Sequence, residues 1–363
     1  MPPVRSASRM WARLLSFFRS RFRAGDMGQT SSNISFRVRR LRRRTPRPPE
    51  QDSSLADNDR PVARDDSASF QAFNKDLHDA VAGDTPNFGW QETSQTQRMQ
   101  KQYIWPPGET ERERMQTQHQ ILKMAFGGRS HFGPTEQFPP GAKILDVGRG
   151  EMFWMLDMAA EFPEAELHVV DFVGAYTHTD LPSNIQIHTC DVDIPLPFPD
   201  NTFDYVHQRM MNFHLKEEDW PRLVNEYARV AKRGAVIELF EPDSYIHNPG
   251  PMTDTFVIAT MFAVRSRGIN PSIARQLKQL LERAKVRDVV YEMVSIPLGD
   301  YGGPIGTRWK INNQALMRAS APFLAKALGF TPDEMEDKAQ QVEQEFEEFR
   351  SYDNVRVAYG FKR

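Results

Sequence analysis

Cysteine and long apolar runs are scarce in this chain of 363 residues. Its one cysteine, Cys190, excludes an internal disulfide and is compatible with a reducing compartment, so we expect an intracellular protein. The sequence has no run that approaches the roughly 18 apolar residues of a membrane-spanning helix. Apolar residues make up 39% of the chain, below the roughly 45–50% of an ordinary globular domain. This deficit predicts a polar extension attached to a domain with a normal core.

Acidic residues are almost absent from residues 1–47, which contain 13 arginines and one acid, Asp26. The remaining 316 residues carry a net charge of −14. Because nucleic acid binding depends on clustered positive charge, any such binding would belong to this first segment. No specific nucleic acid partner is predicted for the rest of the chain.

Two patterns in the basic segment resemble targeting signals. On a helix, the apolar residues of 11–22 share one face and most arginines point away, which is typical of a transit peptide or of a helix on a membrane surface. Residues 27–32 fit the N-myristoylation pattern if translation starts at Met27. The arginine-rich run 37–44 would then be a second membrane signal, or it is a nuclear import signal. Nucleus, mitochondrion and membrane contact stay open, beside a charged leader with no destination.

Residues 45–95 are rich in proline, aspartate, serine, glutamine and asparagine and show no sustained period. We interpret them as a disordered linker, because such a composition buries too little apolar surface to fold. The chain is therefore predicted to divide into a disordered tail, residues 1–95, and a folded domain, residues 96–363.

Strand and helix patterns alternate in the folded domain. Apolar strands are predicted at 143–148, 166–172, 185–191, 203–209 and 235–241, and helices at 109–126, 152–161 and 217–232. This alternation predicts an α/β fold with a doubly wound, mostly parallel sheet, whose ligand crevice lies at the carboxyl ends of the strands. After the fifth strand we expect helices at 252–267, 272–284, 312–328 and 332–350, and strands at 286–296 and 355–361.

A glycine turn after the first strand points to a nucleoside cofactor. Asp146 stands two residues before Gly148, and Asp171 ends the next strand, where an acid can bind ribose hydroxyls. A dinucleotide site with the pattern G-x-G-x-x-G would need a third glycine at position 153, which is Phe153. The acid ahead of the glycines suits S-adenosylmethionine (SAM) better, because it can hold the amino group of that cofactor and no pyrophosphate has to be cradled.

Residues from about 103 to 363 resemble the fungal LaeA-like, or TAM-domain, family of class I SAM-dependent methyltransferases. The matching segments are 111–119, 144–148, 161–165, 197–209, 219–223 and 296–299. The resemblance implies a mostly parallel seven-stranded sheet with added helices after the fifth strand. It also implies methyl transfer from SAM to an unidentified acceptor, a small molecule or a protein side chain, in secondary metabolism.

The resemblance also implies roles for individual residues. Asp146, Gly148 and Gly150 would line the methionine part of SAM, Asp171 would hold the ribose, and Asp191 with the backbone of Val192 would face the adenine. The fourth strand would end beside the transferable methyl group, where His207 is a candidate general base because histidine titrates near neutral pH. The alternative for His207 is a hydrogen-bonded structural histidine.

The turn departs from the family pattern at two positions. Met152 stands where a small residue is expected, and its bulk predicts weakened SAM binding. Arg149 is expected to compensate by offering a charged donor to the carboxylate of the cofactor. The departure also favours a second hypothesis, in which the domain is a regulatory module that binds a protein partner and has weak or no activity.

Other polar residues are given ordinary roles. Glu238 and Glu241, at the end of the fifth strand, are expected to be solvated at the surface. His178, His188 and His247 show no ligand spacing, so no metal site is predicted.

The basic tail generates one testable prediction. A fluorescent fusion of residues 1–50 should localise to mitochondria, nucleus or membrane, because the apolar face of 11–22 and the arginine run of 37–44 are both targeting patterns. The measurement is microscopy of two fusions, one that starts at Met1 and one that starts at Met27. A uniform cytoplasmic signal from both would contradict the prediction.

Overall fold

The computed structural model describes residues 109–136, 138–148, 150–171, 181–190, 195–265, 268–328 and 330–363. These residues all belong to one compact unit, residues 86–363. The predictions for the basic segment and the linker, and those for Arg149, Asp191 and Val192, lie outside the described residues. The division at residues 95 and 96 stays a prediction. In the part that is described, no helix is both long and apolar enough to cross a membrane.

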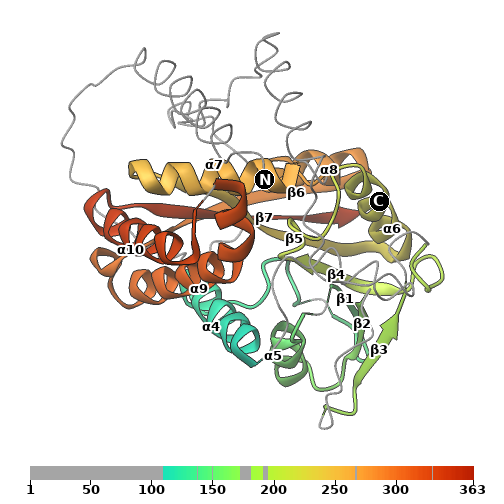
Figure 1. Ribbon diagram of the computed structural model, residues 1–363. Helices are drawn as coiled ribbons and strands as arrows, with labels where there is room; N and C mark the ends of the chain where they lie inside the picture. Colours follow the sequence, from blue (N-terminus) through green and yellow to red (C-terminus); the bar gives the residue numbers. More distant parts are fainter. Residues whose placement is uncertain are drawn as a thin grey trace, which may run out of the picture. The chain divides into compact units, whose positions relative to one another are not determined.

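The described strands form a seven-stranded sheet in the order β3-β2-β1-β4-β5-β7-β6 (Figure 1). Strands β1 to β5 pair in parallel, and β7 is inserted antiparallel between β5 and β6. The predicted fold class is therefore confirmed. The strands are β1 (Lys143–Val147), β2 (Glu166–Asp171), β3 (Ile185–Thr189), β4 (Phe203–Arg209), β5 (Ala231–His247), β6 (Val286–Pro297) and β7 (Tyr352–Lys362).

Helices cover both faces of this sheet because its central strands are apolar on both sides. Neighbouring residues of a strand point to opposite faces. Ile144 of β1 accordingly packs in a core with Trp154, whereas Leu145 packs in a second core with Trp220. Trp154 belongs to α5 (Phe153–Glu161), and Trp220 belongs to α6 (Asp219–Val230). Two further helices join these layers, α4 (Glu109–Ala125) beside α5 and α8 (Leu277–Arg283) beside α6.

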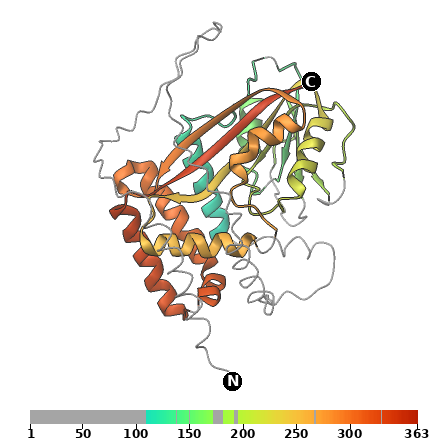
Figure 2. The same cartoon turned by 90° about the horizontal axis from the view of Figure 1, so that it is seen from above.

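Three long helices follow β5 and gather near α4, away from α6 and α8 (Figures 1 and 2). They are α7 (Pro251–Arg265), α9 (Gly303–Leu328) and α10 (Pro332–Glu348). Helix α9 contacts α4, α7 and α10, so it connects the added helices to α4. Two short 3₁₀ turns, η1 (Ile273–Gln276) and η2 (Asp300–Gly302), precede α8 and α9.

Two elements are longer than the sequence predicted. Helix α9 begins at Gly303 and not near residue 312, since a proline at position 304 is tolerated in the first turn of a helix and Trp309 is buried there. Strand β5 continues past residue 241 through an irregularity between Pro242 and Ile246, because its final part pairs only with β7.

Buried ion pairs stabilise the irregular part of β5. Asp243 is fully buried and lies 3.1 Å from the guanidinium of Arg356 on β7 and 2.7 Å from Nε of Arg275 on η1. A buried carboxylate is stable only where such partners remain. These pairs therefore fix η1 against the two antiparallel strands.

Helix α7 has its first turn held from another helix. The carboxylate of Glu345, on α10, accepts hydrogen bonds from the backbone N–H groups of Met252 (3.0 Å) and Thr253 (2.7 Å) and from the Thr253 hydroxyl (2.9 Å). The first N–H groups of a helix have no partner within the helix. Gly250 leaves room for this carboxylate, because a Cβ there would lie 2.4 Å from Cδ of Glu345.

We predict that Glu345→Ala lowers the free energy of unfolding by about 2–3 kcal/mol, since it leaves buried donors at the start of α7 without an acceptor. Urea denaturation of the full chain measures the change. The matched control is Gln344→Ala, an exposed change on the same helix, which should stay within about 0.5 kcal/mol of the parent chain. Equal stabilities of the two variants would contradict the prediction.

Candidate functional site

The turn after β1 requires its glycines. The backbone N–H of Gly148 donates to the carbonyl of Val170 at the end of β2 (2.9 Å), and Gly148 has a φ of 84°. A Cβ at Gly148 would lie 2.4 Å from Sδ of Met211, which follows β4. Gly150 has a φ of 47°, and a Cβ there would lie 2.7 Å from Cε of Met115 on α4. The left-handed backbone and the close neighbours both favour glycine.

The side chain of Met152 lies in the core and not in this turn, so the steric reason for weakened cofactor binding is absent. The affinity itself stays a prediction. The Met152 side chain is 1% exposed and packs in the core with Trp154 and Met155. The backbone at Met152 is left-handed, with a φ of 61°, at the position before the first residue of α5. The family's preference for glycine here fits that backbone conformation, whereas the methionine side chain fills the core.

Asp146 is held by a neighbouring strand and not by the start of α5. Its Oδ1 lies 2.8 Å from Nδ1 of His207 on β4, the residue directly opposite it in the sheet. Both side chains are buried, and α5 has no side-chain cap. Asp146 therefore does not cap α5.

His207 is enclosed on several sides. The ring of Trp154 stacks on it with centroids 3.7 Å apart and planes 5° from parallel. Nε2 of His207 lies 3.8 Å from Oε1 of Glu238 on β5. The residue is 1% exposed, so its side chain does not project into an open crevice. This environment matches the structural alternative for His207.

The expectation that Glu238 is solvated is wrong, because Glu238 is fully buried. Its Oε2 accepts hydrogen bonds from the backbone N–H groups of Phe132 (2.7 Å) and Gly133 (2.9 Å) and from the hydroxyl of Tyr205 (2.6 Å). Burial and the charge of Glu238 raise the pKa of Tyr205 well above its usual value. Tyr205 therefore stays protonated and donates.

Glu241 is also fully buried, again against expectation, and it holds the turn after β4. Oε1 accepts from the Gln208 side chain (2.8 Å) and the backbone N–H of Met211 (2.9 Å), and Oε2 accepts from the backbone N–H of Asn212 (3.0 Å). Burial raises the pKa of Glu241 to about 8, although the three donors act in the opposite direction. Since Met211 packs on Gly148, this turn also fixes the turn after β1.

A second polar network, which the sequence did not reveal, joins α4 to α5 and β4. His119 lies 3.2 Å from Oδ2 of Asp157, which also accepts from Lys123 (2.6 Å) and the hydroxyl of Ser130 (2.6 Å). Burial alone would raise the pKa of Asp157, but these hydrogen bonds bring it well below its usual value. The one sequence signal was position, since His119 falls on the apolar stripe of α4 between Met115 and Leu122.

The tautomer of His119 follows from its partner on β4. Nη2 of Arg209 lies 3.0 Å from Nδ1 of His119, and a guanidinium can only donate. Nδ1 is therefore the acceptor, and Nε2 carries the proton that is donated to Asp157. Burial lowers the pKa of His119, in agreement with a neutral ring.

The described candidates meet at one edge of the sheet, as predicted. Asp146 and Gly148 lie at the end of β1, Asp171 at the end of β2 and His207 near the end of β4, and these strands are parallel neighbours. The carbonyl of Asp171 accepts from the backbone N–H of Cys190 (3.1 Å), which ties this edge to the end of β3. The glycine turn and the acid after β2 fit a nucleoside cofactor such as SAM.

Residues 144–234 match the family model described as a methyltransferase domain. This stretch of the chain is therefore similar to a methyltransferase domain. The match covers β1 to the start of β5, and thus every candidate residue named above for the cofactor.

Similar proteins include both methyltransferases and regulators. Methyltransferase str3 of Strobilurus tenacellus is 28% identical over 55% of this chain and 72% of its own length. The secondary metabolism regulator LAE1 of Cochliobolus heterostrophus is 28% identical over 54% of this chain and 66% of its own length. The resemblance to LaeA-like proteins is therefore confirmed. The chain spans about two thirds of the length of these relatives.

Among solved structures, the Haemonchus contortus phosphoethanolamine N-methyltransferase 2 in complex with S-adenosyl-L-methionine is 17% identical to this chain. The superposition covers 72% of this chain and 54% of that chain, with a TM-score of 0.40.

We predict that Met152→Gly lowers the free energy of unfolding of this methyltransferase domain by about 1–3 kcal/mol. Loss of a buried methionine costs about 2–5 kcal/mol, and relief of the left-handed backbone returns about 1 kcal/mol. Affinity for S-adenosylhomocysteine, measured by calorimetry, should change less than about threefold. Met152→Leu is the control, because it keeps the apolar volume. A tenfold gain in affinity for the glycine variant would instead place the methionine in the path of the cofactor.

Proposed function

We propose that this chain transfers a methyl group from SAM to an unidentified acceptor, a small molecule or a protein side chain, at the carboxyl edge of β1, β2 and β4. The observation that carries the proposal is the glycine turn after β1, next to two acids at strand ends. Gly148 and Gly150 keep the backbone conformation that the turn requires, and the side chain of Met152 is buried away from it. The acids Asp146 and Asp171 lie at the ends of the two strands that flank this turn.

Each described residue receives a role from its position. Gly148 and Gly150 would let the backbone approach the methionine part of SAM, next to Asp146. Asp171 would bind the ribose hydroxyls. Arg149, which departs from the family pattern, would offer a charged donor to the carboxylate of the cofactor. By the family resemblance, Asp191 with Val192 would face the adenine.

The reaction needs alignment more than proton transfer. SAM supplies a methyl group on a positively charged sulfur, and an acceptor atom displaces that sulfur in line. The positive charge disperses during the step, so the protein mainly has to position the two reactants and exclude water. We propose that His207 contributes by fixing Asp146, since its Nδ1 is engaged there and Trp154 covers its ring.

The regulatory alternative loses its main support. It rested on a turn thought to be obstructed by Met152, and that side chain lies in the core. The similar proteins include both a regulator of secondary metabolism and a methyltransferase, so a role in secondary metabolism is part of the proposal. Regulation through a protein partner would then accompany cofactor binding and not replace it.

Calorimetry of the purified full chain tests the proposed function. SAM and S-adenosylhomocysteine should each bind with one site per chain, because both carry the nucleoside and the amino acid part that the strand edge accommodates. A chain that binds neither compound would overturn the proposal.

We predict that Asp171→Ala weakens SAM binding about ten- to a hundredfold. A carboxylate that accepts hydroxyl hydrogen bonds in a partly desolvated site contributes about 1.5–3 kcal/mol. Asp200→Ala is the control, because the Asp200 side chain is 68% exposed and forms only a surface ion pair with Arg229. Equal affinities of the two variants in calorimetry would remove the ribose role from Asp171.

A further inference from the structure

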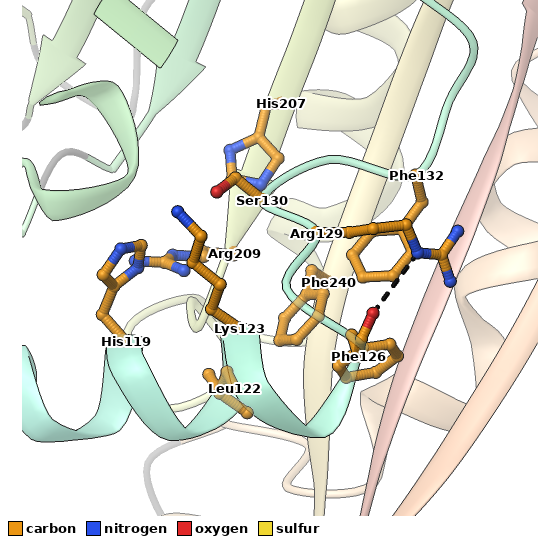
Figure 3. A pocket seen from close by; sticks show the side chains of 10 residues that line it. All are labelled: His119, Leu122, Lys123, Phe126, Arg129, Ser130, Phe132, His207, Arg209 and Phe240. Carbon is orange, nitrogen blue, oxygen red and sulfur yellow. Dashed lines mark hydrogen bonds between the residues drawn. The ribbon is translucent and has the colours of Figure 1, made fainter. Parts of the chain in front are cut away.

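Arg209 is a half-buried cation that lacks an acidic partner among the described residues. It ends β4 and, two residues after His207, projects from the same face of the sheet toward α4 (Figure 3). Its hydrogen bond to His119 is made to a neutral ring. Among the described residues, no carboxylate oxygen lies within 4.0 Å of its guanidinium, although Asp146, Asp157 and Glu238 act on it from farther away.

The hydrogen-bond donors of this guanidinium are only partly used. Burial lowers the pKa of Arg209 below its usual value. A guanidinium has five N–H donors, and the described hydrogen bond to His119 uses one of them. Among the described residues, some fully buried polar atoms have no hydrogen-bond partner, but no nitrogen of Arg209 is one of them. Its remaining nitrogens therefore face accessible space. That space is the feature to explain.

The space is a small cavity of about 10 Å³, roughly the size of one water molecule. Figure 3 shows that Arg209, Lys123 and Arg129 contribute to its wall together with His119 and His207. No described acid lines it. The acid of the adjacent network, Asp157, accepts from His119, Lys123 and Ser130 through Oδ2, and the described contacts include no ion pair between it and Arg209.

The cavity can widen on one side. The side chains of Lys123 and Arg129 are 39% and 40% exposed, so they can move outward at little cost. Arg209 itself is fixed at the end of a central strand. A ligand with two oxygens would therefore meet a rigid guanidinium fork at the base and the mobile ammonium group of Lys123 at the rim, whereas Arg129 stays paired with Glu292. A guanidinium fork is the geometry for bidentate binding of a carboxylate.

We propose that Arg209, with Lys123 beside it, forms a binding site for a carboxylate group at the carboxyl end of β4, and that His119 holds the guanidinium in place. The carboxylate comes from the methionine end of SAM or from the methyl acceptor, and in both cases it would lie next to the transferable methyl group. The inference rests on the proposed function for its position in the reaction, but the site itself rests on the unpaired charge.

The test uses the full chain and three probes. S-adenosylhomocysteine carries the amino acid carboxylate, and 5′-methylthioadenosine has the same nucleoside without it. The third probe is acetate, which is a free carboxylate. We compare the melting temperature of the chain saturated with S-adenosylhomocysteine in acetate and in chloride at equal ionic strength. The variants are Arg209→Gln and Arg209→Lys. Arg129→Gln serves as the control, because Arg129 also lines the cavity but pairs with Glu292.

Two results support the site and separate its sources. If the carboxylate belongs to the cofactor, Arg209→Gln weakens the binding of S-adenosylhomocysteine about tenfold or more and leaves the binding of methylthioadenosine unchanged. If it belongs to the acceptor, both nucleosides bind as before, and acetate stabilises the parent chain but not Arg209→Gln. Arg129→Gln should behave like the parent chain in each case.

Two other results overturn the site. Equal weakening of both nucleosides would show that Arg209 only supports the fold, and unchanged nucleoside binding without an Arg209-dependent acetate effect would show that no carboxylate binds. If Arg209→Gln does not fold, Arg209→Lys decides by the same comparisons, since it keeps the charge and loses the fork. Failure of the proposed function looks different, because the parent chain itself then binds neither nucleoside. In that case the acetate comparison is made on the chain without a nucleoside.

Discussion

A chain of buried polar side chains joins β1, β4 and β5, and the cofactor edge depends on it. Asp146 contacts His207, His207 faces Glu238, and Glu238 accepts from Tyr205 and from the loop after α4. Removing any member would leave its neighbour buried without a partner, which costs more than the hydrogen bond itself contributes. This shared dependence holds the ends of the three strands in one fixed arrangement, on which the position of any bound cofactor relies.

Tight packing connects the two turns at this edge. Glu241 fixes the turn after β4, and Met211 in that turn packs on Gly148 in the turn after β1. A change in one turn would therefore displace the other. The same edge contains Arg209, whose charge has no acidic partner among the described residues. In the described part of the chain, one edge of the sheet thus combines rigid hydrogen-bonded groups with a cation that has no acidic partner, a contrast that marks where a ligand would interact.

Much of the fold could be predicted from local patterns. Apolar runs on β1, β2 and β4 alternate with helices of period 3.6, and this order of elements leads to a parallel sheet covered on both faces. The bounds of β4 and of α5 agree within a residue or two. The start of α9 was missed, because glycine and proline there indicate a loop in isolation, whereas packing of Trp309 makes the helix the better conformation.

The sequence by itself determined the class of the fold and the gathering of Asp146, Asp171 and His207 at one edge, because strand ends follow from short-range periodicity and parallel strands end at the same edge of a sheet. Only the tertiary structure decided what those side chains touch. It buried Glu238 and Glu241, turned Met152 into the core and paired His119 with Arg209 across 90 positions of the chain. Such contacts depend on how distant segments pack, and no local pattern encodes the burial that sets their charge and their partners.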